Sequence, residues 1–510
     1  MTTHRVAPVP FTVVLAAALA IGAGCARSGT QASGPSPTAT VTSTAPFTAA
    51  NPFYASSTLP YGAPPFDRIH DGDYRPAIDE GMRQQIREVA AITGQATPAT
   101  FDNTIVALER SGQLLTRVMK VFSGLTSANT NDTLQAIQSE EAPRLAAHYD
   151  AIFLDDALFR RVSAVYDARD RLGLTPEQKY LVERYHLDFV RAGAQLAEAD
   201  KTKLRAMNQE ESKLTTEFQN RLLAATKAGA PVFNDSSSLE GLSAADLAAA
   251  AESAKERSLD GKWVLPLQNT TQQPAQASLV RRSVREQLYE ASTHRADRGD
   301  TNDTRAIIQR LAQLRADRAQ LLGYPTDADY ILADQMAKTP TAAVKLLTEI
   351  GGPAVAKAHE EAARMQSLID RQHGGFTLEP WDWQYYAEQV RKADYELDES
   401  QIKPYFELDR VLRDGVFYAA TQLYGVTFKE RKDIPVYQPD VRVFEVFDAD
   451  GTSLALFYCD YFKRDNKGGG AWMDSFVDQS GLLGTKPVVY NVATSPSRRR
   501  GNQRCSASTT

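Results

Sequence analysis

The sequence predicts a mainly α-helical protein with a small β-sheet near its C-terminal end. Two observations predict this fold class. Most of the segments between residues 51 and 426 place apolar residues three and four positions apart, the spacing that gives a helix one apolar face. After Phe428 the spacing changes to two, with β-branched and aromatic residues, as in strands. The sheet therefore follows a long helical region.

The helical region divides into several predicted helices and two short strand segments. Residues 77–92, 101–125, 175–196 and 200–226 are predicted helices, and Thr175 with Pro176 is a typical helix start. Residues 230–235 and 262–269 are short and β-branched or aromatic between Asp, Asn, Gly and Pro, which favours strands. Helices resume over residues 279–295, 304–323 and 340–370. An aromatic cluster follows over residues 378–428, and the favoured interpretation is helix starts and core packing by Trp381, Trp383, Tyr385 and Tyr386.

The C-terminal region alternates as strands do. Residues 440–462 form a predicted hairpin that turns at Asp448–Gly451, with Cys459 as a small buried residue. The glycine-rich stretch 464–476 leads into another strand, and residues 486–492 form the last one. Because that stretch lacks the Lys-Ser/Thr of a phosphate loop and opens no helix, it does not predict nucleotide binding.

Composition sets limits on the class of partner. The chain has 510 residues, of which 43% are hydrophobic and 24% charged, with a formal net charge of -6. Nucleic-acid binding normally needs a basic face, so this balance argues against a nucleic-acid partner. The three cysteines, Cys25, Cys459 and Cys505, are too few and too far apart for a disulfide framework.

The N-terminus predicts export. Residues 1–25 combine Arg5, an apolar run from Phe11 to Ile21 and small residues before Cys25, which is typical of a secretory signal of the lipoprotein type. We expect lipidation at Cys25, so that the membrane is reached only through a lipid anchor. The alternative is a plain signal peptide with an incidental cysteine. Residues 26–48 are rich in Ser, Thr, Pro and Gly and predict a disordered tether. The expected location is the periplasm.

No catalytic constellation follows from the residues alone. A common zinc hydrolase needs two His four positions apart with Glu after the first, and the nearest approach is His359-Glu360, followed by Ala363. That half-motif is interpreted as solvated surface on a charged helix. No Gly-x-Ser-x-Gly elbow occurs either. No residue is therefore assigned a catalytic or metal-binding role.

Four long stretches carry a family resemblance. They are "NPFYASSTLPYGAPPFDRI", "GYPTDADYILADQMAKTP", "WDWQYYAEQVRKADYELDESQIKPYFELDRVLRDGVFYAATQLYGVTF" and "VFDADGTSLALFYCDYFKRDNKGGGAWMDSF". From about Asn51 to Val492 the chain resembles the thimet-oligopeptidase family of zinc metallopeptidases, in particular bacterial peptidyl-dipeptidases (dipeptidyl carboxypeptidases). The resemblance implies a large multi-helical, zincin-like fold, a zinc cofactor on a His-Glu-x-x-His helix, and a monomer. It also implies short unfolded peptides as substrates, with release of C-terminal dipeptides.

The resemblance stops after Val492. Where the family continues with Cys-Asn and then Lys-Pro, this chain reads Ala-Thr-Ser-Pro-Ser-Arg-Arg-Arg-Gly. When the possible codons of Ala493 to Thr510 are regrouped one nucleotide earlier, they permit the family's phrase from Asn-Phe-Thr-Lys-Pro to Phe-Asp-Asp. We therefore expect a frameshift, with residues 493–510 as an out-of-frame tail and no role for Arg498–Arg500 or Cys505.

The expected division of the chain follows from this. Residues 49–265 form an N-terminal helical domain, and residues 266–492 form the first part of the catalytic region. The zinc helix of the family would lie beyond the break, so the catalytic domain is expected to be incomplete, with no zinc bound and no activity in this chain. We also expect the terminal strands to expose apolar surface. The alternative function is a non-catalytic remnant that binds peptides weakly at most.

Overall fold

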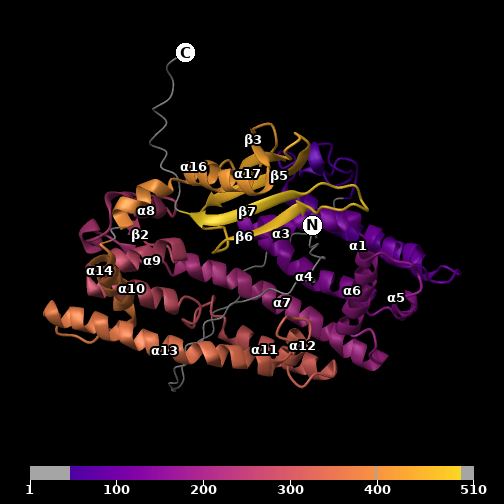
Figure 1. Ribbon diagram of the computed structural model, residues 1–510, viewed down its shortest axis with the longest axis horizontal. Coiled ribbons are helices and arrows are strands. Elements are labelled where there is room, and N and C mark those ends of the chain that lie inside the picture. Colours follow the sequence, from indigo (N-terminus) through magenta and orange to yellow (C-terminus); the bar gives the residue numbers. More distant parts are fainter. Residues whose placement is uncertain (1–45, 397–398, 496–510) are drawn as a thin grey trace, which may run out of the picture. The chain divides into compact units, whose positions relative to one another are not determined.

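Helices make up most of the chain that the structure, a computed structural model, describes: residues 46–396 and 399–495 (Figure 1). These residues belong to a single unit that begins at Ala45. The predicted fold class, mainly α with a small sheet near the C-terminal end, is confirmed. The predicted boundary at residue 265/266 falls between β2 and α9 inside that unit.

The first helices follow the predicted apolar spacing. In α6 the side-chain oxygen of Thr175 accepts a hydrogen bond from the backbone amide of Gln178, and the backbone amide of Thr175 donates one to Gln178 Oε1. Pro176 occupies the first helical position, so the predicted start is confirmed. The N-terminal helical segments are η1 (Pro60–Gly62), η2 (Asp71–Asp73), α1 (Tyr74–Thr93), η3 (Phe101–Val106), α2 (Ala107–Arg110), α3 (Gln113–Ala128), α4 (Asp132–Phe153), α5 (Asp156–Ala168), α6 (Pro176–Ala192) and α7 (Glu198–Ala228).

The predicted helix over residues 101–125 is interrupted. Gly112 has a φ of 70°, a left-handed conformation that ends α2 and lets α3 start in a new direction. The Glu88 carboxylate of α1 accepts a hydrogen bond from the Gly112 amide at 2.7 Å, which fixes the break. Apolar spacing continues across the turn, so the sequence pattern alone could not reveal it.

The middle of the chain has two very short strands and further helices. The strands β1 (Val232–Phe233) and β2 (Trp263–Val264) pair antiparallel, which confirms the two predicted strand segments in shorter form. The helical segments here are η4 (Ser236–Leu239), α8 (Ala244–Lys255), α9 (Asn269–Ser278), α10 (Arg282–Thr293), α11 (Arg305–Leu321), α12 (Asp327–Leu332) and α13 (Pro340–Arg371).

The aromatic cluster packs around a buried ion pair. Arg285 of α10 and Asp382 are joined at 2.8 Å, and the Arg285 guanidinium lies over the ring of Tyr385. Tyr386 is buried against Met365 and Ile369, the end of α13, which confirms its predicted packing role. The segments of this region are η5 (Pro380–Asp382), α14 (Trp383–Tyr395), α15 (Glu399–Ile402), η6 (Lys403–Phe406), α16 (Leu408–Arg410), η7 (Val411–Phe417) and α17 (Tyr418–Tyr424).

The sheet near the C-terminal end has five strands in the order β3-β4-β5-β7-β6. The predicted hairpin is confirmed as β4 and β5, whereas β3 was not predicted. Strand β7 runs parallel to β5 and antiparallel to β6, so it lies inside the sheet. The strands are β3 (Thr427–Arg431), β4 (Arg442–Phe447), β5 (Ser453–Phe462), β6 (Trp472–Val477) and β7 (Val488–Ser495).

Helices cover both faces of this sheet, with α3 on one side and α17 on the other (Figure 1). Tyr458, Phe476 and Tyr490 pack in the same core as Val118 and Phe122 of α3. The opposite face carries Phe444 and Cys459, which pack with Leu412 and Phe417 of η7. Cys459 is thus buried, as predicted.

The last strand corrects one expectation. Strand β7 continues through Ala493 and Thr494 to Ser495, past the predicted end at Val492. Its residues alternate between buried and half-buried, with Val488, Tyr490, Val492 and Thr494 facing the core. The expected exposure of apolar surface is not seen on β7, which β5 and β6 flank. It is seen on β6, the edge strand of the sheet, where Met473 is 62% exposed.

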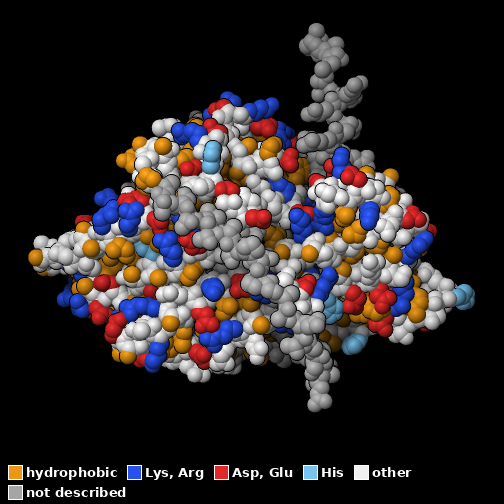
Figure 2. All heavy atoms as spheres, turned by 180° about the vertical axis from the view of Figure 1, so that it is seen from behind, with side chains coloured by type: hydrophobic (Ala, Val, Ile, Leu, Met, Phe, Trp, Pro, Cys, Tyr) orange, Lys and Arg blue, Asp and Glu red, His pale blue; other side chains and the backbone are white. Residues whose placement is uncertain are grey.

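The surface carries both signs of charge. On the face shown in Figure 2, basic and acidic side chains are interspersed rather than separated. Within residues 46–396 and 399–495, no helix has both the length and the apolar character to cross a membrane.

Candidate functional site

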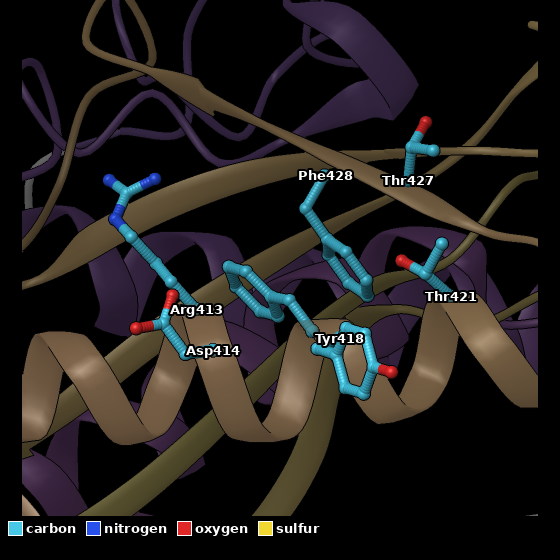
Figure 3. Close-up of a pocket in the computed structure, with 7 residues that line it drawn as sticks. Arg413, Asp414, Tyr418, Thr421, Thr427 and Phe428 are labelled. Atoms are coloured by element: carbon cyan, nitrogen blue, oxygen red, sulfur yellow. The ribbon is translucent and has the colours of Figure 1, made fainter.

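A hollow of about 390 Å³ lies where η7 and α17 meet β3 (Figure 3). Phe428 points from β3 toward the helical segments that carry Arg413, Asp414, Tyr418 and Thr421. The rings of Phe417 and Phe428 stack with their centroids 4.0 Å apart and their planes 6° apart. The lining residues are Arg413, Asp414, Phe417, Tyr418, Thr421, Thr427 and Phe428.

The local sequence folds this way because the chain reverses sharply between α17 and β3. Gly425 has a φ of 74°, which terminates α17. The Thr421 hydroxyl donates to the carbonyl of Val426 at 2.7 Å, so the turn is tied to the last turn of the helix. Thr427 and Phe428 then start β3 directly opposite η7. The hollow is the space left between the two arms of this reversal.

The charges at the hollow are largely satisfied by neighbours. Arg413 donates to Glu430 Oε2 at 2.8 Å, and Arg442 donates to Glu430 Oε1 at 2.8 Å. The hydrogen bond from Arg442 is the main reason that the pKa of Glu430 is lowered. Tyr418 is 61% exposed, so its ring is open to a ligand. This arrangement can hold an aromatic or aliphatic group on the two phenylalanine rings, but it places no base beside a nucleophile.

Sequence reasoning missed this hollow. It assigned the aromatic cluster over residues 378–428 to packing, and Phe417 and Phe428 do pack. The exposed Tyr418 and the gap beside it depend on the reversal at Gly425. Only a glycine after the helix signalled that turn.

The described histidines do not converge. The imidazole of His148 is buried and bonded to Gln85 at 2.7 Å, and that of His186 stacks on Tyr166 at 3.9 Å. His359 is exposed on α13, where Glu360 pairs with Lys357 at 3.2 Å, so the interpretation of His359-Glu360 as solvated surface is confirmed. In the part of the chain that the structure describes, no three His, Cys, Asp or Glu side chains are grouped so that they could hold a metal ion.

The described residues therefore do not fit a zinc ion, and no catalytic step through zinc is derived from them. The predicted lipidation residue, Cys25, lies outside the described residues, as does His4. The predicted absence of nucleotide binding at the glycine-rich stretch remains a prediction. Its lysine, Lys467, is buried and bonded to Asp460 and to three backbone carbonyls.

The comparison with known proteins identifies the region that includes this site. Residues 275–501 match the model of peptidase family M3. The dipeptidyl carboxypeptidase of Escherichia coli strain K12 is 54% identical over 445 residues, 87% of this chain and 65% of that protein. Residues 275–501 of this chain belong to peptidase family M3. The resemblance to the oligopeptidase family of zinc metallopeptidases, with bacterial dipeptidyl carboxypeptidases among its relatives, is thereby confirmed.

Two further relatives match the chain over a similar length. The dipeptidyl carboxypeptidase of Salmonella typhimurium is 52% identical over 442 residues, 87% of this chain and 65% of that protein. Oligopeptidase A of Escherichia coli strain K12 is 29% identical over 439 residues, 84% of this chain and 64% of that protein. The chain thus spans somewhat less than two thirds of the length of these relatives.

Proposed function

We propose that this chain is part of an enzyme that hydrolyses short peptides and releases C-terminal dipeptides. The observation that carries the proposal is the 54% identity to a dipeptidyl carboxypeptidase over 87% of this chain, compared with 29% to an oligopeptidase A. The substrates are short unfolded peptides. Mixed surface charge on the face seen in Figure 2 agrees with a peptide rather than a nucleic-acid partner.

The zinc site of this enzyme lies outside the residues described. We place its ligands and its general base in sequence encoded after Val492 in the frame shifted by one nucleotide. The regrouped codons of residues 493–510, which spell the phrase of the family, support this placement. By this proposal the 510-residue chain on its own binds no catalytic zinc and has no peptidase activity.

A second candidate function has one observation in its favour. The hollow beside Phe417 and Phe428 offers stacked rings and the exposed Tyr418, which suit an apolar peptide side chain. A non-catalytic remnant that binds peptides weakly is therefore the alternative. This alternative predicts that the 510-residue chain binds peptides and that Phe428→Ala weakens this binding. It also predicts that the product of neither reading frame hydrolyses peptides.

Export is part of the proposal. Residues 1–25 are the signal, and Cys25 is the residue that receives a lipid. The enzyme acts in the periplasm as a monomer held by that anchor. Metabolic labelling with a radioactive fatty acid tests the anchor, because Cys25→Ser abolishes labelling if the proposal holds. Labelling that survives Cys25→Ser contradicts it.

The deciding experiment compares two genes. One encodes the chain as written, and the other has one nucleotide inserted after the codon for Val492. The expected result is release of dipeptides from an N-terminally blocked tetrapeptide, with about one zinc per chain, by the second product alone. No hydrolysis by either product contradicts the peptidase proposal. Zinc binding with hydrolysis by the chain as written contradicts the placement of the zinc site beyond Val492.

A further inference from the structure

Helix α13 carries one apolar stripe along its whole length, but only its C-terminal end is covered. At 100° per residue, one series of small and apolar residues falls within a sector of about 80°. The series is Val344, Leu347, Gly351, Val355, Ala358, Ala362, Met365 and Ile369.

The two ends of this stripe differ in burial. Met365 and Ile369 are 2% and 0% exposed and pack against Tyr386 of α14. Val344, Leu347 and Val355 are 59%, 68% and 58% exposed. Ile350, one helical step to the side of this part of the stripe, is exposed as well. A helix face of this kind is normally turned to a core. The bare part therefore continues an existing interface.

The polar side of the same helix indicates what kind of partner fits. Lys345 lies 3.8 Å from Glu349, and Lys357 lies 3.2 Å from Glu360. Helices that lie on lipid surfaces are rich in Lys and Arg on the polar face. Here acidic and basic residues alternate, which favours a protein partner over a membrane.

We propose that the bare stripe of α13, from Val344 to Val355, is the docking surface for the part of family M3 proteins that lies beyond the matched segment. The matched segment covers only 65% of the two dipeptidyl carboxypeptidases, so about a third of such a protein remains to be packed. The inference rests on the proposed function in that it takes this chain as part of a longer peptidase. The occupant is the segment that follows the matched residues, with an apolar face of its own.

A chimera tests the proposal. Residues 1–492 of this chain are joined to the part of the Escherichia coli dipeptidyl carboxypeptidase that follows its matched segment. Leu347→Glu places a charge on the stripe, and Glu349→Gln changes the polar side as a control. We expect Leu347→Glu to lower the thermal midpoint of the chimera by about 4 °C or more, because a charge would be buried. We expect it to leave the 510-residue chain unchanged, and Glu349→Gln to affect neither protein.

Three other outcomes would overturn the proposal. If Leu347→Glu shifts neither midpoint, nothing covers the stripe in the longer protein. If the 510-residue chain is a dimer that Leu347→Glu dissociates, a second copy is the occupant. If the 510-residue chain binds vesicles through Leu347, a membrane is the occupant. Dipeptide release by the parent chimera is measured separately, so that an inactive chimera with the expected shift contradicts the proposed function and leaves the docking surface standing.

Discussion

The Nζ of Lys467 lies 2.8 Å from Oδ1 of Asp460, and neither side chain has any exposed surface. The same ammonium group donates to the carbonyl oxygens of Asp460, Phe462 and Ala493 at 3.0, 2.7 and 2.9 Å. Asp460 and Phe462 belong to β5, and Ala493 belongs to β7. A single buried lysine from the glycine-rich stretch therefore joins the ends of two parallel strands.

Replacing Lys467 should lower the free energy of unfolding. Lys467→Met leaves the Asp460 charge buried with only Arg464 and Tyr437 as partners, and leaves three carbonyls without their donor. Arg464 still neutralises Asp460, so the loss comes chiefly from the buried groups left without a donor, and we expect about 1–3 kcal/mol in the free energy of unfolding. Urea denaturation measures it. Lys429→Met, on an exposed residue of β3, is the matched control, and equal stability of the two variants would contradict the assignment.

The ion pair between Arg285 and Asp382 permits a similar test with an internal comparison. Asp382 is fully buried and bonded to both Arg285, whose side chain is 1% exposed, and Arg282, whose side chain is 34% exposed. Asp382→Asn leaves the Arg285 charge buried without its counter-ion, and we expect a loss of about 3 kcal/mol or more. Arg282→Gln should cost under about 1 kcal/mol, because that arginine is partly solvated. Similar losses of unfolding free energy in Asp382→Asn and Arg282→Gln would contradict the argument that burial of the charge left behind determines the cost.

The sequence predicted those features of the fold that depend on local pattern. Thr175 and Pro176 marked the start of α6, because capping needs only neighbouring residues. The break at Gly112 and the strand β3 were not predicted, since each depends on a partner distant in sequence or on the φ of one residue. Ala493 and Thr494 were expected to belong to an out-of-frame tail, yet the pairing of β7 with β5 continues to Ser495, while the pairing with β6 ends at Val492.

The candidate site was harder to predict than the fold. The stacking of Phe417 on Phe428 arises from a turn at Gly425, and no local pattern distinguishes it from ordinary packing. The amphipathic spacing of α13 was visible in the sequence, but which part of its stripe is covered depends on where α14 packs. Sequence spacing predicts that a face must be buried and does not identify its partner.

The crossing of α1 and α3 depends on a glycine. A Cβ on Gly81 would lie 2.8 Å from the Cα of Leu115, closer than packed atoms allow. Gly81→Ala must therefore push the two helices apart, and we expect a loss of about 1–3 kcal/mol in the free energy of unfolding. Gly415→Ala in η7 meets no atom within 4 Å and should be neutral or slightly stabilising. Equal effects of the two substitutions in thermal melts would contradict the close contact.

Burial shifts the pKa values of two groups on α4, His148 and Asp150, in opposite directions. Burial lowers the pKa of His148 to about 4. It raises the pKa of Asp150 to about 6, although a hydrogen bond from Asn208 and the charge of Arg205 act the other way. His148 therefore contributes stability that is present above its unfolded pKa, near 6.5, and lost as the pH falls toward 4. Asp150 contributes stability that is present below about pH 4 and lost as the pH rises through 6.

Because these contributions have opposite signs, they nearly cancel between pH 4 and 6, and single substitutions should reveal them. Relative to the parent, Asp150→Asn should become more stable as the pH rises through this range, by up to about 1.4 kcal/mol per pH unit. His148→Gln should become less stable than the parent over the same range, by a similar slope. Urea denaturation of the three proteins at pH 4, 5, 6 and 7 measures the differences in unfolding free energy. The contributions of the other titrating groups are common to all three proteins and cancel in these differences. Parallel profiles of stability against pH for both variants and the parent would mean that burial shifts the pKa of neither His148 nor Asp150.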